Sequence, residues 1–290
     1  MAKSLAAVLK NVKALSESAE DKNLFAMIYS EFGMGKTTTA MGIAQQLRGD
    51  KHILFCDSSD GWTSLEEFPV LMEGADRLQV KDPADLAVIA EGFKKGQLQK
   101  TYSVVVIDES SSIFYQIIED YSRELFGLSE DDMLKPIEGR DYAPPTSAFI
   151  SILKKIHEAD DVHLIITAHS RDVTEDGRKE MRPSFSPTAY REVMRRVQVC
   201  AALSVKTKPV PGTKNRITER TLQLRPTANV AAKTRIPGSP TTVEVGEFLG
   251  LVSEWLNSGS FGEEPQESFE PLIDDELDEA LESLAVSEGS

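Results

Sequence analysis

A glycine-containing loop in residues 27–38 (Met-Ile-Tyr-Ser-Glu-Phe-Gly-Met-Gly-Lys-Thr-Thr) carries the residue types that bind phosphate. Gly33 and Gly35 let the backbone turn its N–H groups toward phosphate oxygens at little steric cost. In such a loop Lys36 reaches the β- and γ-phosphates, and the hydroxyl of Thr37 binds Mg²⁺. The stretch therefore predicts a site for ATP and Mg²⁺.

This loop departs from the usual P-loop pattern at its first position, where Ser30 stands in place of glycine. The departure is mild, because the residues that contact phosphate and metal are all present at the end of the loop. The predicted nucleotide-binding residues are Ser30, Gly33, Met34, Gly35, Lys36, Thr37 and Thr38.

Two acids, Asp108 and Glu109, follow the β-branched run Val-Val-Val-Ile at residues 104–107. An acid at the tip of a buried strand beside the P-loop can hold Mg²⁺, usually through water, and we predict this role for Asp108. Glu109 could orient and deprotonate the attacking water. The alternative is a strand that ends in a solvated acid pair, which is common.

Phosphoryl transfer also needs positive charge opposite the γ-phosphate. Lys233 and Arg235 lie two residues apart in a predicted extended segment, so their side chains share one face. We predict that they supply this charge. A Lys-x-Arg pair is a weak signal on its own, and the alternative is an exposed strand edge.

Residues 171–196 are rich in cations and include two aromatic residues, Phe185 and Tyr190. The cations are Arg171, Arg178, Lys179, Arg182, Arg191, Arg195 and Arg196. Basic side chains with aromatic stackers suit binding of single-stranded DNA without sequence preference. The alternative is a solvated basic helix that pairs with an acidic segment or a neighbouring subunit.

Alternating strand and helix patterns surround these groups. We predict strands at 24–29, 52–57, 77–80, 102–108, 162–168, 198–206 and 217–224, and helices at 37–47, 83–95, 112–126, 146–159, 188–197 and 245–256. Residues 128–145 are predicted as a surface insertion, residues 171–187 as a loop, and the last two strands as a hairpin. The pattern indicates an α/β fold with a doubly wound, mostly parallel sheet, whose strands present the polar groups at their carboxyl ends.

The order of these motifs between residues 23 and 238 resembles the RecA/RadA/DnaB class of P-loop ATPases. It is most similar to the compact RecA-core recombination ATPases of bacteriophages. The resemblance implies ATP hydrolysis, action on single-stranded DNA, and head-to-tail homo-oligomers that form rings or filaments. It also implies that His169 senses the γ-phosphate, and that Lys233 and Arg235 act on the nucleotide of a neighbouring subunit.

One position departs from that class, which often places its catalytic glutamate at the end of the second strand. This chain has Ser58 and Ser59 there, followed by Asp60. Either Asp60 or Glu109 takes the role, or hydrolysis is slow. The rival functions are a ring helicase motor or helicase loader, a nucleotide-gated scaffold without turnover, and a small-molecule kinase.

Charge is unevenly distributed along the 290 residues, of which 40% are apolar. Residues 258–290 hold eleven acidic residues and no lysine or arginine, so residues 1–257 carry only −4 of the formal net charge of −15. We predict an N-terminal amphipathic helix in 1–22, an ATPase core in 23–257, and an acidic linker and tail in 258–290. The tail either stays disordered, or forms an acidic amphipathic segment that docks a partner or competes with DNA for the basic loop.

Other sequence features favour a cytoplasmic protein, in a bacterial host if the chain is phage-encoded. Cys56 and Cys200 stand alone in apolar runs and are expected to be buried, reduced thiols. No apolar run approaches the length of a membrane span, and Lys10 and Lys13 interrupt the N-terminal segment, which argues against a signal peptide.

Overall fold

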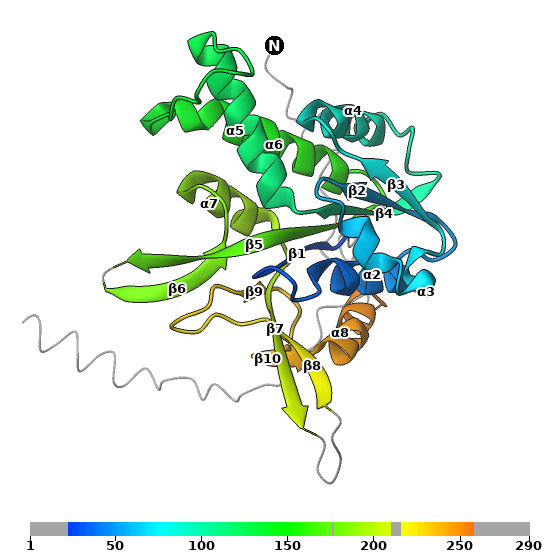
Figure 1. The fold of residues 1–290 in the computed structure, drawn as a ribbon. Helices are drawn as coiled ribbons and strands as arrows, with labels where there is room; N and C mark the ends of the chain where they lie inside the picture. Colours follow the sequence, from blue (N-terminus) through cyan, green and yellow to red (C-terminus); the bar gives the residue numbers. More distant parts are fainter. Residues whose placement is uncertain (1–22, 176, 210–215, 258–290) are drawn as a thin grey trace, which may run out of the picture.

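The apolar, β-branched runs of the chain form a ten-stranded sheet in a computed structural model, which describes residues 23–175, 177–209 and 216–257 (Figure 1). The strands are β1 Phe25–Ser30, β2 His52–Asp57, β3 Ala75–Gln79, β4 Tyr102–Asp108, β5 His163–Glu175, β6 Arg178–Pro183, β7 Val199–Pro209, β8 Arg216–Gln223, β9 Lys233–Thr234 and β10 Thr242–Glu244. The helices are α2 Lys36–Leu47, α3 Pro69–Met72, α4 Pro83–Lys94, α5 Ser110–Phe126, α6 Ala143–His157, α7 Pro187–Arg196 and α8 Val245–Asn257, with 3₁₀ turns at Gly61–Leu65 and Gly139–Tyr142.

The main path of the sheet runs in the order β10-β8-β7-β1-β5-β4-β2-β3, with β6 paired to β5 and β9 paired to β7. β1 lies between β5 and β7 and is parallel to both. The pairs β4–β5, β2–β4 and β2–β3 are also parallel, whereas β7–β8 is antiparallel. The predicted doubly wound, mostly parallel sheet with a terminal hairpin is therefore confirmed.

Helices cover both faces of the sheet (Figure 1). Along β1, Phe25, Met27 and Tyr29 belong to a core that includes side chains of α4, α5, α6 and α7. Ala26 and Ile28 belong to a second core on the opposite face, with side chains of α2 and α8. Burial on both faces explains why the strands read as continuous apolar runs instead of alternating ones.

Local capping signals formed as the sequence predicts. Asp82 is the N-cap of α4, its side chain accepts the backbone N–H of Ala84 at 2.7 Å, and Pro83 occupies the first turn. Gly127 ends α5 in the left-handed conformation, with φ of 60°. These caps fix where α4 begins and where α5 ends.

The prediction of a loop over residues 171–187 is wrong. β5 continues past the sheet, and β6 returns beside it as an antiparallel partner, with pairs from Ser170–Pro183 to Thr174–Lys179. We name this two-stranded extension the ribbon. The ribbon has little apolar alternation, because only Val173, Met181 and Pro183 interrupt its polar side chains, and a strand with so few buried side chains leaves no clear period-2 signal.

Several predictions lie outside the described residues: the helix in 1–22, the tail in 258–290 and the hairpin tip in 210–215. The three-part division of the chain therefore stays a prediction. Among the described helices, none has both the length and the apolar character needed to cross a membrane. Cys56 and Cys200 are buried and free of disulfides, as expected.

Candidate functional site

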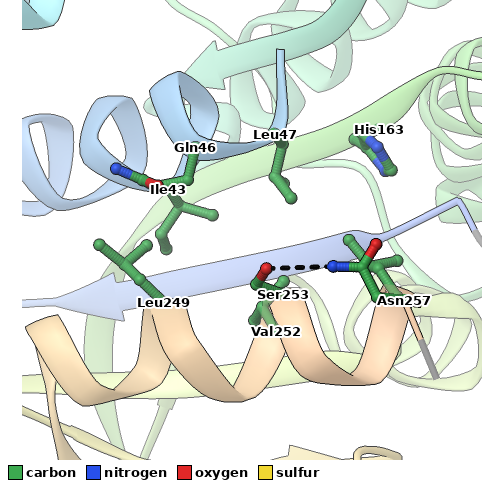
Figure 2. A pocket seen from close by; sticks show the side chains of 9 residues that line it. Ile43, Gln46, Leu47, His163, Leu249, Val252, Ser253 and Asn257 are labelled. Carbon is green, nitrogen blue, oxygen red and sulfur yellow. Dashed lines mark hydrogen bonds between the residues drawn. The ribbon is translucent and has the colours of Figure 1, made fainter. Parts of the chain in front are cut away.

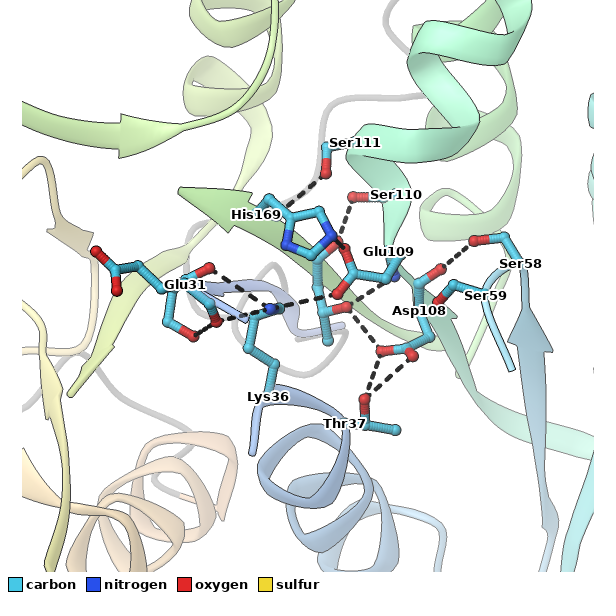
Figure 3. A network of polar contacts seen from close by, with 12 residues as sticks. Glu31, Lys36, Thr37, Ser58, Ser59, Asp108, Glu109, Ser110, Ser111 and His169 are labelled. Carbon is cyan, nitrogen blue, oxygen red and sulfur yellow. Dashed lines mark hydrogen bonds and ion pairs between the residues drawn. The ribbon is translucent and has the colours of Figure 1, made fainter. Parts of the chain in front are cut away.

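The P-loop has the strand–loop–helix geometry that its sequence predicts. β1 ends at Ser30, and α2 begins at Lys36. Gly33 and Gly35 adopt φ of 72° and 83°, a region that favours glycine. Lys36 is 5% exposed, and its ammonium group donates to the carbonyl oxygen of Glu31 at 3.1 Å (Figure 3). The side chain of Lys36 therefore curls back, and its ammonium group binds the backbone of the same loop.

Asp108, at the tip of β4, meets the first turn of α2. The hydroxyl of Thr37 donates to its carboxylate oxygens at 3.1 Å, and Thr167 Oγ1 donates to Oδ1 at 2.7 Å (Figure 3). Burial raises the pKa of Asp108, and the hydroxyls of Thr167 and Thr37 oppose that shift. The two predicted metal-binding residues therefore lie in direct contact.

Glu109 lies in the same cluster. Its Oε1 is 3.3 Å from the ammonium of Lys36, and its Oε2 is 2.6 Å from Nε2 of His169 (Figure 3). Burial raises the pKa of Glu109, and the charge of Lys36 opposes the rise. Its φ of 55° is unusual for a residue other than glycine, and its N–H is held by Thr167 Oγ1 at 2.8 Å. A strained backbone held in this way is typical of functional sites.

His169 reaches the cluster from β5, where it pairs with Ser30. Its backbone N–H donates to Ser111 Oγ at 3.1 Å, and its ring lies against Phe32 with 3.8 Å between ring centroids. Burial and the charge of Lys36 lower the pKa of His169 to about 4. The imidazole that faces Glu109 is therefore neutral at pH 7.

Asp60, the alternative base, lies apart from this cluster. Its side chain is 71% exposed and pairs with Arg77 at 3.0 Å. The buried Asp57 pairs with the same guanidinium at 2.7 Å and accepts the N–H of Gly61 at 2.9 Å. Asp57 therefore shapes the turn after β2, while the carboxylate of Asp60 points to solvent.

The turn after β2 closes over the predicted metal-binding pair. A Cβ at Gly61 would lie 2.0 Å from Oδ2 of Asp108, so only glycine fits there. The described residues contain no cluster of three or more His, Cys, Asp or Glu able to hold a metal ion. A threonine and one aspartate suit Mg²⁺, which keeps waters and takes further oxygen ligands from substrate phosphates.

Lys233 and Arg235 lie beside the start of β7, whereas the P-loop follows the end of β1, the strand parallel to β7. The backbone N–H of Arg235 bonds to Gln198, just before β7 begins. The ammonium of Lys233 donates to the carbonyl of Met194, and Arg235 Nη2 donates to that of Arg195 at 3.1 Å. Both cations thus bond to carbonyls in the last turn of α7, where positive charge is favourable. They do not contact the P-loop of the same chain.

The basic stretch divides between the ribbon and α7. Arg171 pairs with Arg182 across the ribbon, and Arg178 lies on the same face by alternation. Lys179 lies on the other face and pairs with Asp172 at 2.7 Å.

The expectation that Phe185 stacks on bases is wrong. Phe185 is fully buried against Phe114 and Phe149, because it follows the ribbon where the chain re-enters the core. Tyr190 is partly buried and lies under the guanidinium of Arg182.

Serine hydroxyl groups connect the strand ends. Ser58 Oγ donates to the carbonyl of Asp108 at 2.9 Å, and Ser110 Oγ donates to that of Thr167 at 2.6 Å. Their signal in the sequence was the grouping of serine and threonine directly after strands. Asp57, the last residue of β2, was visible in the same way.

A groove lies between α2 and α8, away from this cluster (Figure 2). It is lined by Ile43, Gln46, Leu47, His163, Leu249, Val252, Ser253, Leu256 and Asn257. Burial lowers the pKa of His163 to about 4, so no lining side chain is charged at pH 7. The groove therefore lacks the cations that a polyphosphate requires.

The fold and this cluster define the class of the protein, a P-loop nucleoside triphosphatase. The chain belongs to the AAA domain family, whose model matches residues 22–236. No curated protein matches the chain. Proteins of this class bind a nucleotide with Mg²⁺, and the Lys36, Thr37 and Asp108 arrangement fits that use.

Proposed function

We propose that the protein hydrolyses ATP and acts on single-stranded DNA in recombination or annealing, as a RecA-like ATPase of the kind that bacteriophages carry. One observation carries the proposal. Lys36, Glu109 and His169 come from three separate elements and meet in one buried contact beside the P-loop.

Each residue of this cluster has a role in hydrolysis. Lys36 binds the β- and γ-phosphates, and the backbone N–H groups of the loop hold the phosphate oxygens. Thr37 and Asp108 hold Mg²⁺, which neutralises charge on those oxygens. Glu109 takes the proton of the attacking water, for which its raised pKa suits it. His169, neutral at pH 7, orients the carboxylate of Glu109 and senses the γ-phosphate.

The ribbon supports a role on DNA, because it continues the strand that carries His169. Arg171 lies two residues beyond His169 on β5, next to the nucleotide cluster. Arg178 and Arg182 share its face of the ribbon. A shift of His169 on ATP binding would therefore be passed directly to the basic face.

DNA binding is tested by salt dependence. The double variant Arg178→Ala, Arg182→Ala should bind single-stranded DNA more weakly and flatten the log–log salt slope by about 1.4, since each lost phosphate contact is worth roughly 0.7. Lys179→Ala is the matched control on the opposite face and should leave the slope unchanged. Equal slopes for the double variant and wild type in fluorescence anisotropy would remove the ribbon from the proposal.

Hydrolysis is tested by steady-state ATP turnover with and without single-stranded DNA. Glu109→Gln should lose about 10²- to 10⁴-fold in rate, the usual contribution of a general base, and still bind ATP. Asp60→Asn is the matched control and should be nearly silent, because its carboxylate faces solvent. The reverse ranking would move the base to the turn after β2.

A scaffold without turnover is the second candidate, because Ser58 and Ser59 replace the acid of the second strand. Tight ATP binding without hydrolysis, with or without DNA, would favour it. A ring helicase motor or helicase loader would instead show DNA-stimulated turnover together with strand separation or delivery of a helicase.

We also propose head-to-tail assembly, with Lys233 and Arg235 acting on the nucleotide of the next subunit. Their position away from their own P-loop supports this arrangement, and such contacts build rings or filaments. Arg235→Ala should bind ATP but hydrolyse it poorly, and mixing it with Lys36→Ala should restore part of the rate. Absence of rescue in mixtures shown to co-assemble would argue against action between subunits.

A further inference from the structure

Arg220 of β8 lies against the P-loop and is not among the residues predicted to bind the nucleotide. Its Nε is 3.0 Å and its Cζ 3.6 Å from the position that a Cβ on Gly35 would occupy. Gly35 is the residue directly before the P-loop lysine and has φ of 83°. Glycine at this position therefore serves two purposes, since it permits the left-handed backbone and leaves room for the guanidinium.

The hairpin of β7 and β8 brings Arg220 to this place. β7 pairs with β1 up to Ala202 opposite Tyr29, and then continues beyond the end of β1. β8 returns alongside, with Arg220 opposite Val205. A contact between the hydroxyls of Ser204 and Thr221 at 2.8 Å supports this register. Arg220 is therefore presented at the carboxyl edge of the sheet, where the P-loop lies.

Arg220 meets the P-loop at Gly35, next to Thr38 in the first turn of α2. Thr38 Oγ1 lies 3.1 Å from the same point above Gly35, whereas the ammonium of Lys36 faces Glu109. In a P-loop the backbone N–H groups and the start of the helix hold the α- and β-phosphates. Arg220 is an exposed residue, and its guanidinium lies beside this phosphate-binding part of the loop.

We propose that Arg220 binds the α- and β-phosphates of the nucleotide. A guanidinium offers paired N–H donors that match phosphate oxygens, and charge-assisted bonds of this kind are the stronger ones. Lys233 and Arg235 cannot take this role within one chain, because they bond to the end of α7 and lie beside the start of β7, away from the P-loop at the end of β1. This inference rests on the proposed function only in requiring that the P-loop binds a nucleotide.

Titration calorimetry with ADP and with a non-hydrolysable ATP analogue tests the proposal on the full chain. Arg220→Ala should weaken both nucleotides by a similar factor of about ten or more, the usual effect of losing one charge-assisted hydrogen bond. Arg220→Lys keeps the charge and should recover part of that loss. Arg225→Ala is the matched control, because this exposed arginine follows β8 on the side away from the P-loop.

The outcomes separate this inference from the proposed function. Unchanged ADP affinity in Arg220→Ala, with wild type binding normally, would overturn the inference alone. Weaker binding of the ATP analogue but not of ADP would also overturn it, because the contact would then be to the γ-phosphate. Wild-type protein that binds neither nucleotide would refute both. Thermal melts by circular dichroism establish that each variant is folded.

Discussion

Thr167 offers the sharpest test of how the catalytic acids are held. It is fully buried, and its single hydroxyl makes two bonds. It donates to Asp108 Oδ1 at 2.7 Å and accepts the backbone N–H of Glu109 at 2.8 Å. Thr167→Val is nearly isosteric, so it removes both bonds with little change in volume.

The expected cost follows from those two contacts. A buried N–H left without an acceptor costs about 1–3 kcal/mol, and a lost hydrogen bond to a charged group costs about 1.5–3 kcal/mol. Burying a methyl group in place of the hydroxyl offsets roughly 1 kcal/mol. We therefore expect Thr167→Val to lower the free energy of unfolding by about 1.5–5 kcal/mol.

Urea unfolding and nucleotide turnover measure the two consequences. Thr167→Ser is the control, because it keeps the hydroxyl and loses only a methyl, at a cost of about 1 kcal/mol. Glu109, freed from its left-handed conformation, should also lose turnover in the valine variant more than in the serine variant. A valine variant that is as stable and active as the serine variant would refute the bridging role.

Three further outcomes are expected. Lys36→Ala should abolish tight nucleotide binding in calorimetry without unfolding the chain, and unchanged affinity would show that the P-loop is not the site. Gly61→Ala should weaken Mg²⁺-dependent nucleotide binding, because its Cβ would lie 2.0 Å from Oδ2 of Asp108. Gly42→Ala is the control, because a Cβ at Gly42 would have open space around it. That variant should leave the stability of the protein unchanged or raise it by about 0.5–1 kcal/mol. His163 has a pKa of about 4 in the folded protein, against 6.5 for the free side chain. The unfolded chain therefore binds more protons than the folded chain between pH 4 and pH 6.5. The free energy of unfolding should fall as the pH drops from 6.5 to 4. The fall is at most about 3.5 kcal/mol, at roughly 1.4 kcal/mol per pKa unit, and urea unfolding of His163→Gln should show a flatter dependence.

Local signals were enough to predict most of the fold. The β-branched runs became β2 and β4 with the expected bounds, because a strand buried on both faces must be apolar throughout. Asp82 with Pro83, and Gly127, marked helix ends, because capping depends on residues within one turn. The glycine spacing of the P-loop was equally readable, since it serves the backbone of a single short loop.

Local sequence patterns did not predict the ribbon, for a physical reason. It leaves the main sheet and is mostly polar, with Met181 packed against the core, and therefore lacks the periodicity that marks a strand. The prediction that Phe185 stacks on bases failed for a different reason. It stands among basic residues in sequence, and its burial depends on the chain turning back between α5 and α6, which no neighbour in sequence reveals.

The sequence by itself determined which residues could bind phosphate and metal, because those residues are adjacent in the P-loop or end an apolar strand. Tertiary structure alone decided which distant groups join them. His169 meets Glu109 because β5 and β4 are neighbours in the sheet. Arg220 reaches Gly35 because β8 pairs with the part of β7 that extends beyond the end of β1. Strand order depends on the packing of the whole core, so residues far apart in the chain carry no local mark of the contacts they will make.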